Sequence, residues 1–191
     1  GLTKAYPVYK VRLDYLFYND QNDRIATWIS QYKTQHEGKV PNYDNKEDYN
    51  EIIEEFIVES NPNAIEKTKR NIEMFDQREP GVVLSDGRII DGNRRFTCLR
   101  QLAENKERFN YFEAVILDRN IENSAKQIKI LELSIQHGEE SKVDYNPIDR
   151  LVGIYNDIIS THLLSIEEYA KSTNDSESEV KKRVEIAMLM V

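Results

Sequence analysis

The fold is decided by residues 79–100, which read EPGVVLSDGRIIDGNRRFTCLR. Val82–Leu84 is a short β-branched run, Asp86-Gly87 is typical of a hairpin turn, and Ile89-Ile90 resumes the apolar extended pattern. Gly92 permits a sharp turn of the backbone, and from Asn93 onward apolar residues recur at helical spacing. The stretch therefore predicts a strand, a tight turn, a second strand and the start of a helix.

The start of this helix has the features of an anion site. The N–H groups of a first helical turn lack intrahelical partners and lie at the positive end of the helix dipole. Arg94 and Arg95 add guanidinium groups beside them. We therefore predict that Gly92, Asn93, Arg94 and Arg95 bind a phosphate group. A structural alternative stays open, because arginines on a first turn also pair with a nearby acid such as Asp91.

The order of the segments around this site resembles the ParB/sulfiredoxin-like superfamily, and ParB-type partition and regulatory proteins in particular. Residues 92–98 meet the arginine-box pattern G-x-x-R-x-x-A, with Cys98 in the alanine position. Residues 11–24 resemble the opening ParB strand and loop, which ends in an arginine, here Arg24. The resemblance implies an α+β fold in which a ParB/sulfiredoxin-like N-terminal domain with a small mixed sheet is followed by an all-α segment.

The resemblance also implies two domains. The ParB-like domain covers residues 1–123, with an insertion at about 37–69 where the likeness is weakest. A helical domain covers residues 124–191 and carries a helix-turn-helix at 164–189.

Local signals for two helices support that last assignment. Ser165 with Glu168 and Ser176 with Glu179 each form the pattern of a capping box. Asn174 between them can adopt the left-handed conformation that a tight turn requires. The pattern predicts two short helices joined by a turn, although a helical hairpin that never contacts DNA has the same signature.

The charge balance limits the role of this helix pair in DNA binding. The chain has 26 Lys and Arg against 34 Asp and Glu, a net charge of −8, whereas DNA-binding chains are usually basic. Glu177 and Glu179 stand at the end of the second helix that would approach the bases, where carboxylates repel phosphates. We expect weak DNA binding, through these residues of the second helix and its start: Ser176, Ser178, Lys181, Lys182 and Arg183.

The resemblance to ParB proteins implies a nucleotide switch. A nucleoside triphosphate, with CTP as the first candidate, would bind at the arginine box with Mg²⁺, and Arg24 and Thr97 join the predicted phosphate contacts. Glu132 aligns with the glutamate of the family motif E-N-x-x-R and is the predicted metal ligand. Leu133 and Gln136 replace the asparagine and arginine of that motif.

Two other functions stay open. Residues 91–97 also resemble the D-G-Q-Q-R-x-T box of ParB-like nuclease domains from defence systems, which would make Asp91 and Glu132 the catalytic, metal-holding acids. Slow hydrolysis of a nucleotide, as in a CTPase, is the other enzymatic activity that stays open. A non-catalytic interaction adaptor that only retains the fold is the third alternative.

Composition sets the remaining expectations. No apolar run approaches membrane-spanning length, and the single cysteine fits a reducing compartment, so we expect a cytoplasmic protein without a membrane partner. Cys98 falls on the inner side of its helix and is predicted to pack there, unlike the reactive cysteine of sulfiredoxin. A homodimer is left open.

Overall fold

The computed structural model describes residues 5–42, 44–118, 125–138 and 147–190. Internal contacts divide the chain into two units. The sheet unit consists of Gly1–Asn19 and Pro41–Asn120, and the helical unit consists of Asp20–Val40 and Ile121–Val191. Residues 20–40, which lie within the predicted ParB-like domain of residues 1–123, pack with the C-terminal helices in the helical unit. The predicted boundary at 123/124 lies outside the described residues.

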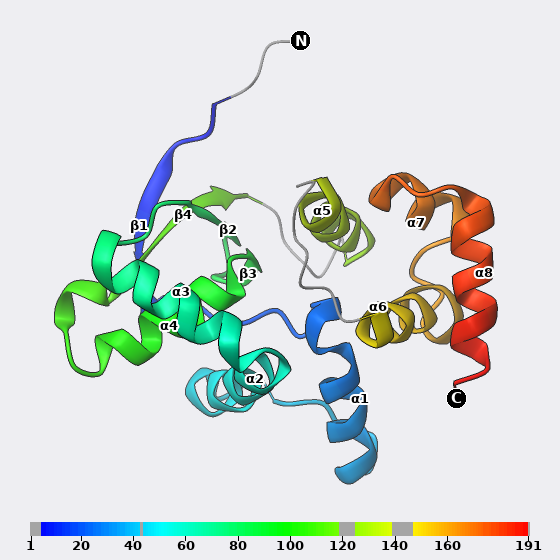
Figure 1. Cartoon of the computed structure of the whole chain (residues 1–191), viewed down its shortest axis with the longest axis horizontal. Coiled ribbons are helices and arrows are strands. Elements are labelled where there is room, and N and C mark those ends of the chain that lie inside the picture. The colour runs from blue at the N-terminus through cyan, green and yellow to red at the C-terminus, as the bar shows by residue number, and fades with distance from the viewer. Residues whose placement is uncertain (1–4, 43, 119–124, 139–146, 191) are drawn as a thin grey trace. The chain divides into compact units, whose positions relative to one another are not determined.

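The sheet unit is built on a four-stranded mixed sheet (Figure 1). Its strands are β1 (Val8–Arg12), β2 (Gly81–Leu84), β3 (Ile89–Asp91) and β4 (Tyr111–Leu117), in the order β1-β4-β2-β3. β4 runs antiparallel to β1 and parallel to β2, and β2 and β3 form an antiparallel hairpin. The α+β class with a small mixed sheet is confirmed.

The β2–β3 hairpin has the turn that its sequence predicts. Asp86 accepts a hydrogen bond from the Arg88 N–H through Oδ1 (2.9 Å), and Gly87 has φ = 93°. A Cβ at Gly87 would lie 2.2 Å from the carbonyl oxygen of Tyr15. Glycine is therefore required there both for its backbone conformation and for the close approach of the N-terminal segment.

Three helices accompany this sheet: α2 (Lys46–Ser60), α3 (Pro62–Phe75) and α4 (Asn93–Ala103). The side chain of Asn61 caps α3 by accepting a hydrogen bond from the Ala64 N–H (3.0 Å). Short 3₁₀ turns, η1 (Leu13–Tyr15) and η3 (Glu107–Phe109), precede the core segment 16–18 and β4. The largest fully buried side chains of the unit are aromatic and come from all its parts: Tyr18, Tyr49, Phe96 and Phe112.

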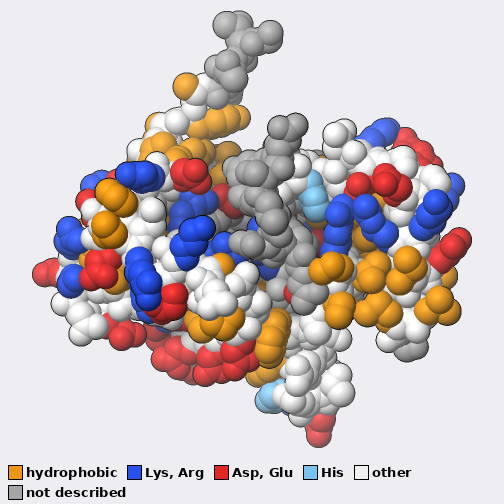
Figure 2. All heavy atoms as spheres, in the orientation of Figure 1, with side chains coloured by type: hydrophobic (Ala, Val, Ile, Leu, Met, Phe, Trp, Pro, Cys, Tyr) orange, Lys and Arg blue, Asp and Glu red, His pale blue; other side chains and the backbone are white. Residues whose placement is uncertain are grey.

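Within the stretch predicted as an insertion, about 37–69, α2 contributes side chains to this core. Tyr49 of α2 is buried, and its hydroxyl donates to the carbonyl oxygen of Tyr18 (3.0 Å). Arg100 of α4 pairs with Glu54 (2.7 Å) and Glu47 (2.8 Å) of α2. The outer face of α2 is strongly acidic, as the red side chains along the lower edge of this unit show (Figure 2).

The helical unit contains η2 (Asp23–Ile25), α1 (Ala26–Gln35), α5 (Ala125–Gly138), α6 (Pro147–Ile154), the π-helical turn η5 (Tyr155–Ser160), α7 (Ile166–Thr173) and α8 (Glu177–Met188). Its core is a cluster of buried apolar side chains: Leu133, Ile154, Ile158, Leu164, Tyr169, Ala170, Val180 and Val184. No helix among the described residues is both long enough and apolar enough to cross a membrane.

The two predicted capping boxes are confirmed. The hydroxyl of Ser165 accepts from the Glu168 N–H, the hydroxyl of Ser176 accepts from the Glu179 N–H, and each glutamate accepts the N–H of its serine in return. Asn174 adopts the left-handed conformation with φ = 56°. α7 and α8 are thus two short helices joined by a tight turn.

Candidate functional site

The strand β3 ends at Asp91, and the chain turns at Gly92 into α4. Gly92 has φ = 100°, in the left-handed region, and a Cβ there would lie 2.7 Å from the ring of Phe112. Because Gly92 is the N-cap residue and has no side chain, α4 begins without a side-chain cap. The first turn therefore directs its N–H groups away from the helix with no capping oxygen of its own.

Asn93, the first residue of α4, is a buried polar residue. It is only 7% exposed, and its Oδ1 has no hydrogen-bond partner among the described residues. A buried polar atom without a partner costs free energy, so such atoms often mark a place where a ligand or water completes the set. The amide can present either its oxygen or its nitrogen, because the two are exchanged by a simple flip.

Arg95 is held by the protein itself. Its Nη1 donates to the carbonyl oxygens of Glu79 (2.6 Å) and Pro80 (3.1 Å), and its Nη2 donates to Asp91 (2.8 Å). These contacts fasten the segment before β2 and the end of β3 to α4. The structural role predicted for these arginines, pairing with a nearby acid, is thus filled by Arg95 with Asp91. The neighbouring Arg94 lies on the same first turn and is partly exposed.

Thr97 and Cys98 lie one turn further along α4 and are fully buried. The hydroxyl of Thr97 contacts the Tyr18 hydroxyl (2.7 Å) and donates to the carbonyl oxygen of Asn93 (3.1 Å). Burial raises the pKa of the Cys98 thiol to about 12, which suits a packing residue. We therefore leave Thr97 out of the phosphate contacts, and its hydroxyl supports the turn that carries Asn93.

Arg24 and Glu132 belong to the helical unit. Arg24 lies in η2, where Asn22 caps its N–H (3.1 Å). Glu132 is 1% exposed and accepts a hydrogen bond from Gln136 (3.0 Å), with the ammonium of Lys129 at 3.9 Å. The described residues contain no group of three His, Cys, Asp or Glu side chains arranged to hold a metal ion. Glu132 thus lies in the interior of the helical unit beside Gln136 and Lys129.

The residues predicted to contact DNA lie at the start and on the surface of α8. Ser176 is the cap of the helix, Ser178 and Lys182 are exposed, and Lys181 lies 3.9 Å from Glu177. Arg183 pairs with Asp175 (2.7 Å). Neighbouring carboxylates therefore offset two of the three cations.

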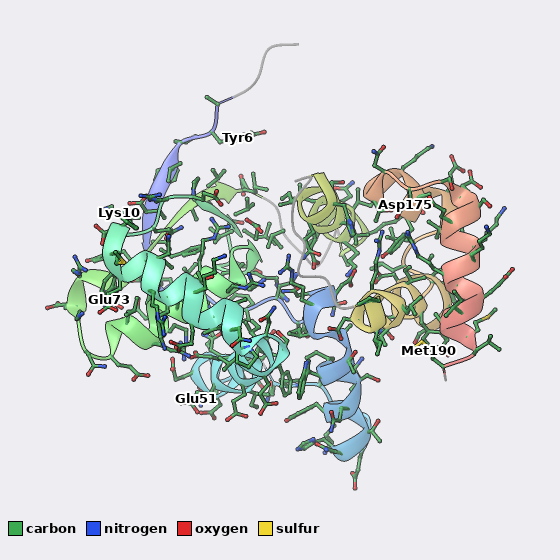
Figure 3. The ribbon with its side chains drawn as sticks, viewed as in Figure 1. Tyr6, Lys10, Glu51, Glu73, Asp175 and Met190 are labelled. Carbon is green, nitrogen blue, oxygen red and sulfur yellow. The ribbon has the colours of Figure 1, made fainter. Side chains whose placement is uncertain are left out.

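Asp175 and Arg150 form an ion pair that the sequence did not predict. Oδ2 of Asp175, in the turn between α7 and α8 (labelled in Figure 3), accepts hydrogen bonds from Arg150 (2.6 Å), Arg183 (2.7 Å) and Thr173 (2.8 Å). Arg150 comes from α6, 25 residues earlier in the chain. No local pattern signals this pairing, because it depends on how α6 packs against α8.

No family model matches the chain, and no curated protein matches it. Among solved structures it is similar to a Pnob8-like ParB-N domain, with a TM-score of 0.52 and 13% sequence identity. The match covers 100% of this chain and 71% of the other chain. The likeness shows the fold: this chain has the ParB-N-like α+β architecture that its segment order predicts.

Proposed function

We propose that the chain is a ParB-like regulatory module that binds a phosphate-bearing ligand, in the first instance a nucleoside triphosphate, at the N-terminus of α4. The observation that carries this proposal is the start of α4. There the first turn follows a left-handed glycine that offers no capping side chain, beside a buried asparagine whose Oδ1 has no partner among the described residues. The N–H groups and the positive dipole end at a helix N-terminus are a favourable place for a phosphate.

The electrostatics of this end favour the same ligand. Asp91 is the carboxylate closest in sequence to the first turn of α4, and the guanidinium of Arg95, at 2.8 Å, offsets its charge. Arg94, on the same turn, supplies the second cation, and the helix dipole adds a partial positive charge. In this proposal Gly92, Asn93 and Arg94 contact the phosphate, whereas Arg95 positions the loop around it.

The α7–α8 pair is the element that such a ligand would regulate. Its two capping boxes and tight turn have the form of a helix-turn-helix, and a ParB-like fold makes DNA the first partner to test. The acidic start of α8 and the pairing of Arg183 with Asp175 leave few cations for phosphate contacts. We propose that this chain contacts DNA weakly, and that a homodimer or a further segment supplies the rest.

Catalysis is not part of the proposal. A hydrolytic site needs acids that hold a metal near the phosphates. Asp91 is committed to Arg95, and Glu132 is committed to Gln136 and Lys129 in the other unit. Nucleotide binding without appreciable turnover therefore fits these side chains better than nuclease chemistry.

A panel of ligands in a thermal-shift assay tests the binding proposal. CTP, ATP, GTP, UTP, pyrophosphate and the matching nucleosides are each added with and without Mg²⁺. A ligand at 100 times its dissociation constant stabilises the folded state by about 2.7 kcal/mol, so binding is readily visible. We expect phosphate-bearing ligands to raise the melting temperature, and nucleosides to leave it unchanged.

Two matched variants locate the effect. Arg94→Ala removes the proposed phosphate contact, and Arg70→Ala removes an exposed arginine of α3 in the same unit. We expect the ligand-induced shift to be lost in R94A and kept in R70A. A shift that survives in both variants, or that no phosphate ligand produces in the parent, overturns the proposed function.

A further inference from the structure

The helical unit buries a cluster of charged side chains, which we call the Lys129 cluster: Asp23, Lys129, Glu132 and Asp157. The ammonium of Lys129 lies 2.6 Å from Asp23, 3.4 Å from Asp157 and 3.9 Å from Glu132, and it also donates to the carbonyl oxygen of Gln21 (2.8 Å). Among the described residues, three carboxylates thus lie around one ammonium. If all were ionised, these four side chains would carry a net charge of −2, and burying like charges together is costly.

The three carboxylates are not equally well stabilised. Asp23 makes the short contact with the ammonium, and Glu132 accepts a hydrogen bond from Gln136 (3.0 Å). Asp157 is joined to Lys129 by a longer ion pair of 3.4 Å, and its buried Oδ2, like that of Asp23, has no hydrogen bond among the described residues. Asp157 is therefore the group that gains most from taking up a proton.

The protonation equilibria agree with this geometry. Burial raises the pKa of Asp157 to about 7, although the ammonium of Lys129 acts in the opposite direction. Burial lowers the pKa of Lys129, but Asp23, Glu132 and Asp157 outweigh it, so that this pKa lies well above its ordinary value. Lys129 stays charged at neutral pH, and Asp157 titrates there.

Among the described residues, the charges that act on the Asp157 carboxyl are those of Lys129 and Asp23. Tyr169 of α7 is buried nearby, and its hydroxyl has no hydrogen-bond partner among the described residues. From α6, Asp149 is hydrogen-bonded to Thr27, and Arg150 is held by Asp175. α8 packs on this region through apolar side chains, Val180 and Val184.

Asp157 also lies in the turn that leads into the α7–α8 pair. It lies in the π-helical turn η5, an element that is rare and common at functional positions. Its carbonyl oxygen accepts the N–H of Leu164 (3.0 Å), directly before the Ser165 cap of α7. A change of charge at Asp157 therefore acts on the connection that leads into the α7–α8 pair.

We propose that Asp157 is a proton-dependent lock of the helical unit: with its proton bound the Lys129 cluster is closed, and on losing the proton near neutral pH the cluster and the η5 turn are loosened. Between the ordinary pH range of an unfolded aspartate and neutrality, the folded state holds a proton that the unfolded state lacks. Stability consequently falls as pH rises toward 7 and levels off above about pH 8.

The single tryptophan gives a specific reporter. Trp28 lies on α1 in the helical unit, and the sheet unit contains no tryptophan. We expect the melting temperature followed by Trp28 fluorescence in the whole chain to fall as the buffer changes from pH 5.5 to pH 8. His137 works in the opposite direction, since burial lowers its pKa and its protonation destabilises the fold at acid pH.

Asp157→Asn mimics the protonated side chain and is the decisive variant. We expect D157N to unfold at a higher temperature than the parent at pH 8, and to lose the fall between pH 5.5 and pH 8. Glu167→Gln, which neutralises an exposed acid of α7, is the matched control and keeps the parental pH dependence. Carbon-13 NMR titration of the Asp157 carboxyl group gives a second measurement on the unmutated chain.

The outcomes separate clearly. A midpoint near pH 7 for the Asp157 carboxyl supports the lock, and a midpoint below pH 5 overturns it. If D157N folds but is less stable than the parent at pH 8 and keeps the same pH dependence, Asp157 is an ordinary ionised partner of Lys129 and the proposal fails. Circular dichroism confirms that each variant is folded before comparison.

Discussion

Replacing Arg95 by alanine should destabilise the sheet unit even without a ligand. The guanidinium donates to the carbonyl oxygens of Glu79 and Pro80 and to the carboxylate of Asp91. In R95A all three acceptors lose the guanidinium as a donor, and the Asp91 side chain, 15% exposed, loses its ion pair with Arg95. The segment before β2 also loses its attachment to α4.

The magnitude follows from the degree of burial. The Arg95 side chain is 17% exposed, so water screens the pair only partly. Hydrogen bonds to charged groups contribute about 1.5–3 kcal/mol each, and removing one partner of a fully buried pair costs about 3–5 kcal/mol. We expect R95A to cost about 2–4 kcal/mol. With a denaturant dependence of about 2 kcal/mol per molar urea, the unfolding midpoint falls by about 1–2 M.

Urea unfolding followed by far-ultraviolet circular dichroism measures this change in the absence of ligand. Arg94→Ala serves as the comparison, because the three hydrogen bonds described above all come from the adjacent Arg95. We expect R94A to have a midpoint within about 0.3 M of the parent, as for most surface substitutions. If R95A unfolds at the same urea concentration as the parent, the attachment contributes nothing, and the separation of roles between Arg94 and Arg95 is wrong.

Three further predictions test other parts of the structure. Gly92→Ala should cost at least about 1–2 kcal/mol, because the left-handed conformation is unfavourable for alanine and its Cβ meets Phe112; an unchanged urea midpoint would contradict this. Duplex DNA should bind weakly, with a shallow salt dependence, in a fluorescence anisotropy titration. Asp175→Asn weakens the ion pairs that hold Arg150 and Arg183, so it should strengthen DNA binding and steepen the salt dependence. Tight DNA binding by the parent at physiological salt would contradict this account. Plasmid and single-stranded DNA should stay intact with Mg²⁺ or Mn²⁺, and cleavage that disappears in both Asp91→Asn and Glu132→Gln would instead favour the nuclease alternative.

Features that depend on neighbouring residues were predictable from the sequence. The capping boxes at Ser165 and Ser176 require only a serine and a glutamate three residues apart, and both are present in the structure. The Asp86-Gly87 turn and the left-handed Asn174 are equally local. The fold itself was predicted from the order of segments around residues 79–100, which resembles that of ParB-type proteins.

Contacts between distant segments were not predictable in this way. Lys129 meets Asp23 across 106 residues of sequence, and no helical or strand pattern marks either residue as buried. The same applies to residues 20–40, whose α1 leaves the sheet unit because it packs with α6. At the candidate site, the sequence indicated both roles for the arginines, but only the positions of the Glu79 and Pro80 carbonyl oxygens assign the structural role to Arg95.

The central claim is that a phosphate group binds at the first turn of α4. Nitrogen-15 NMR of the whole chain, titrated with CTP and the other nucleoside triphosphates and then with cytidine, tests it most directly. The account predicts that the backbone amide signals of residues 92–96 shift most, that at least one triphosphate produces the shift, and that cytidine does not. Triphosphate titrations that leave these amides unmoved, or that shift only amides elsewhere in the chain, would contradict it.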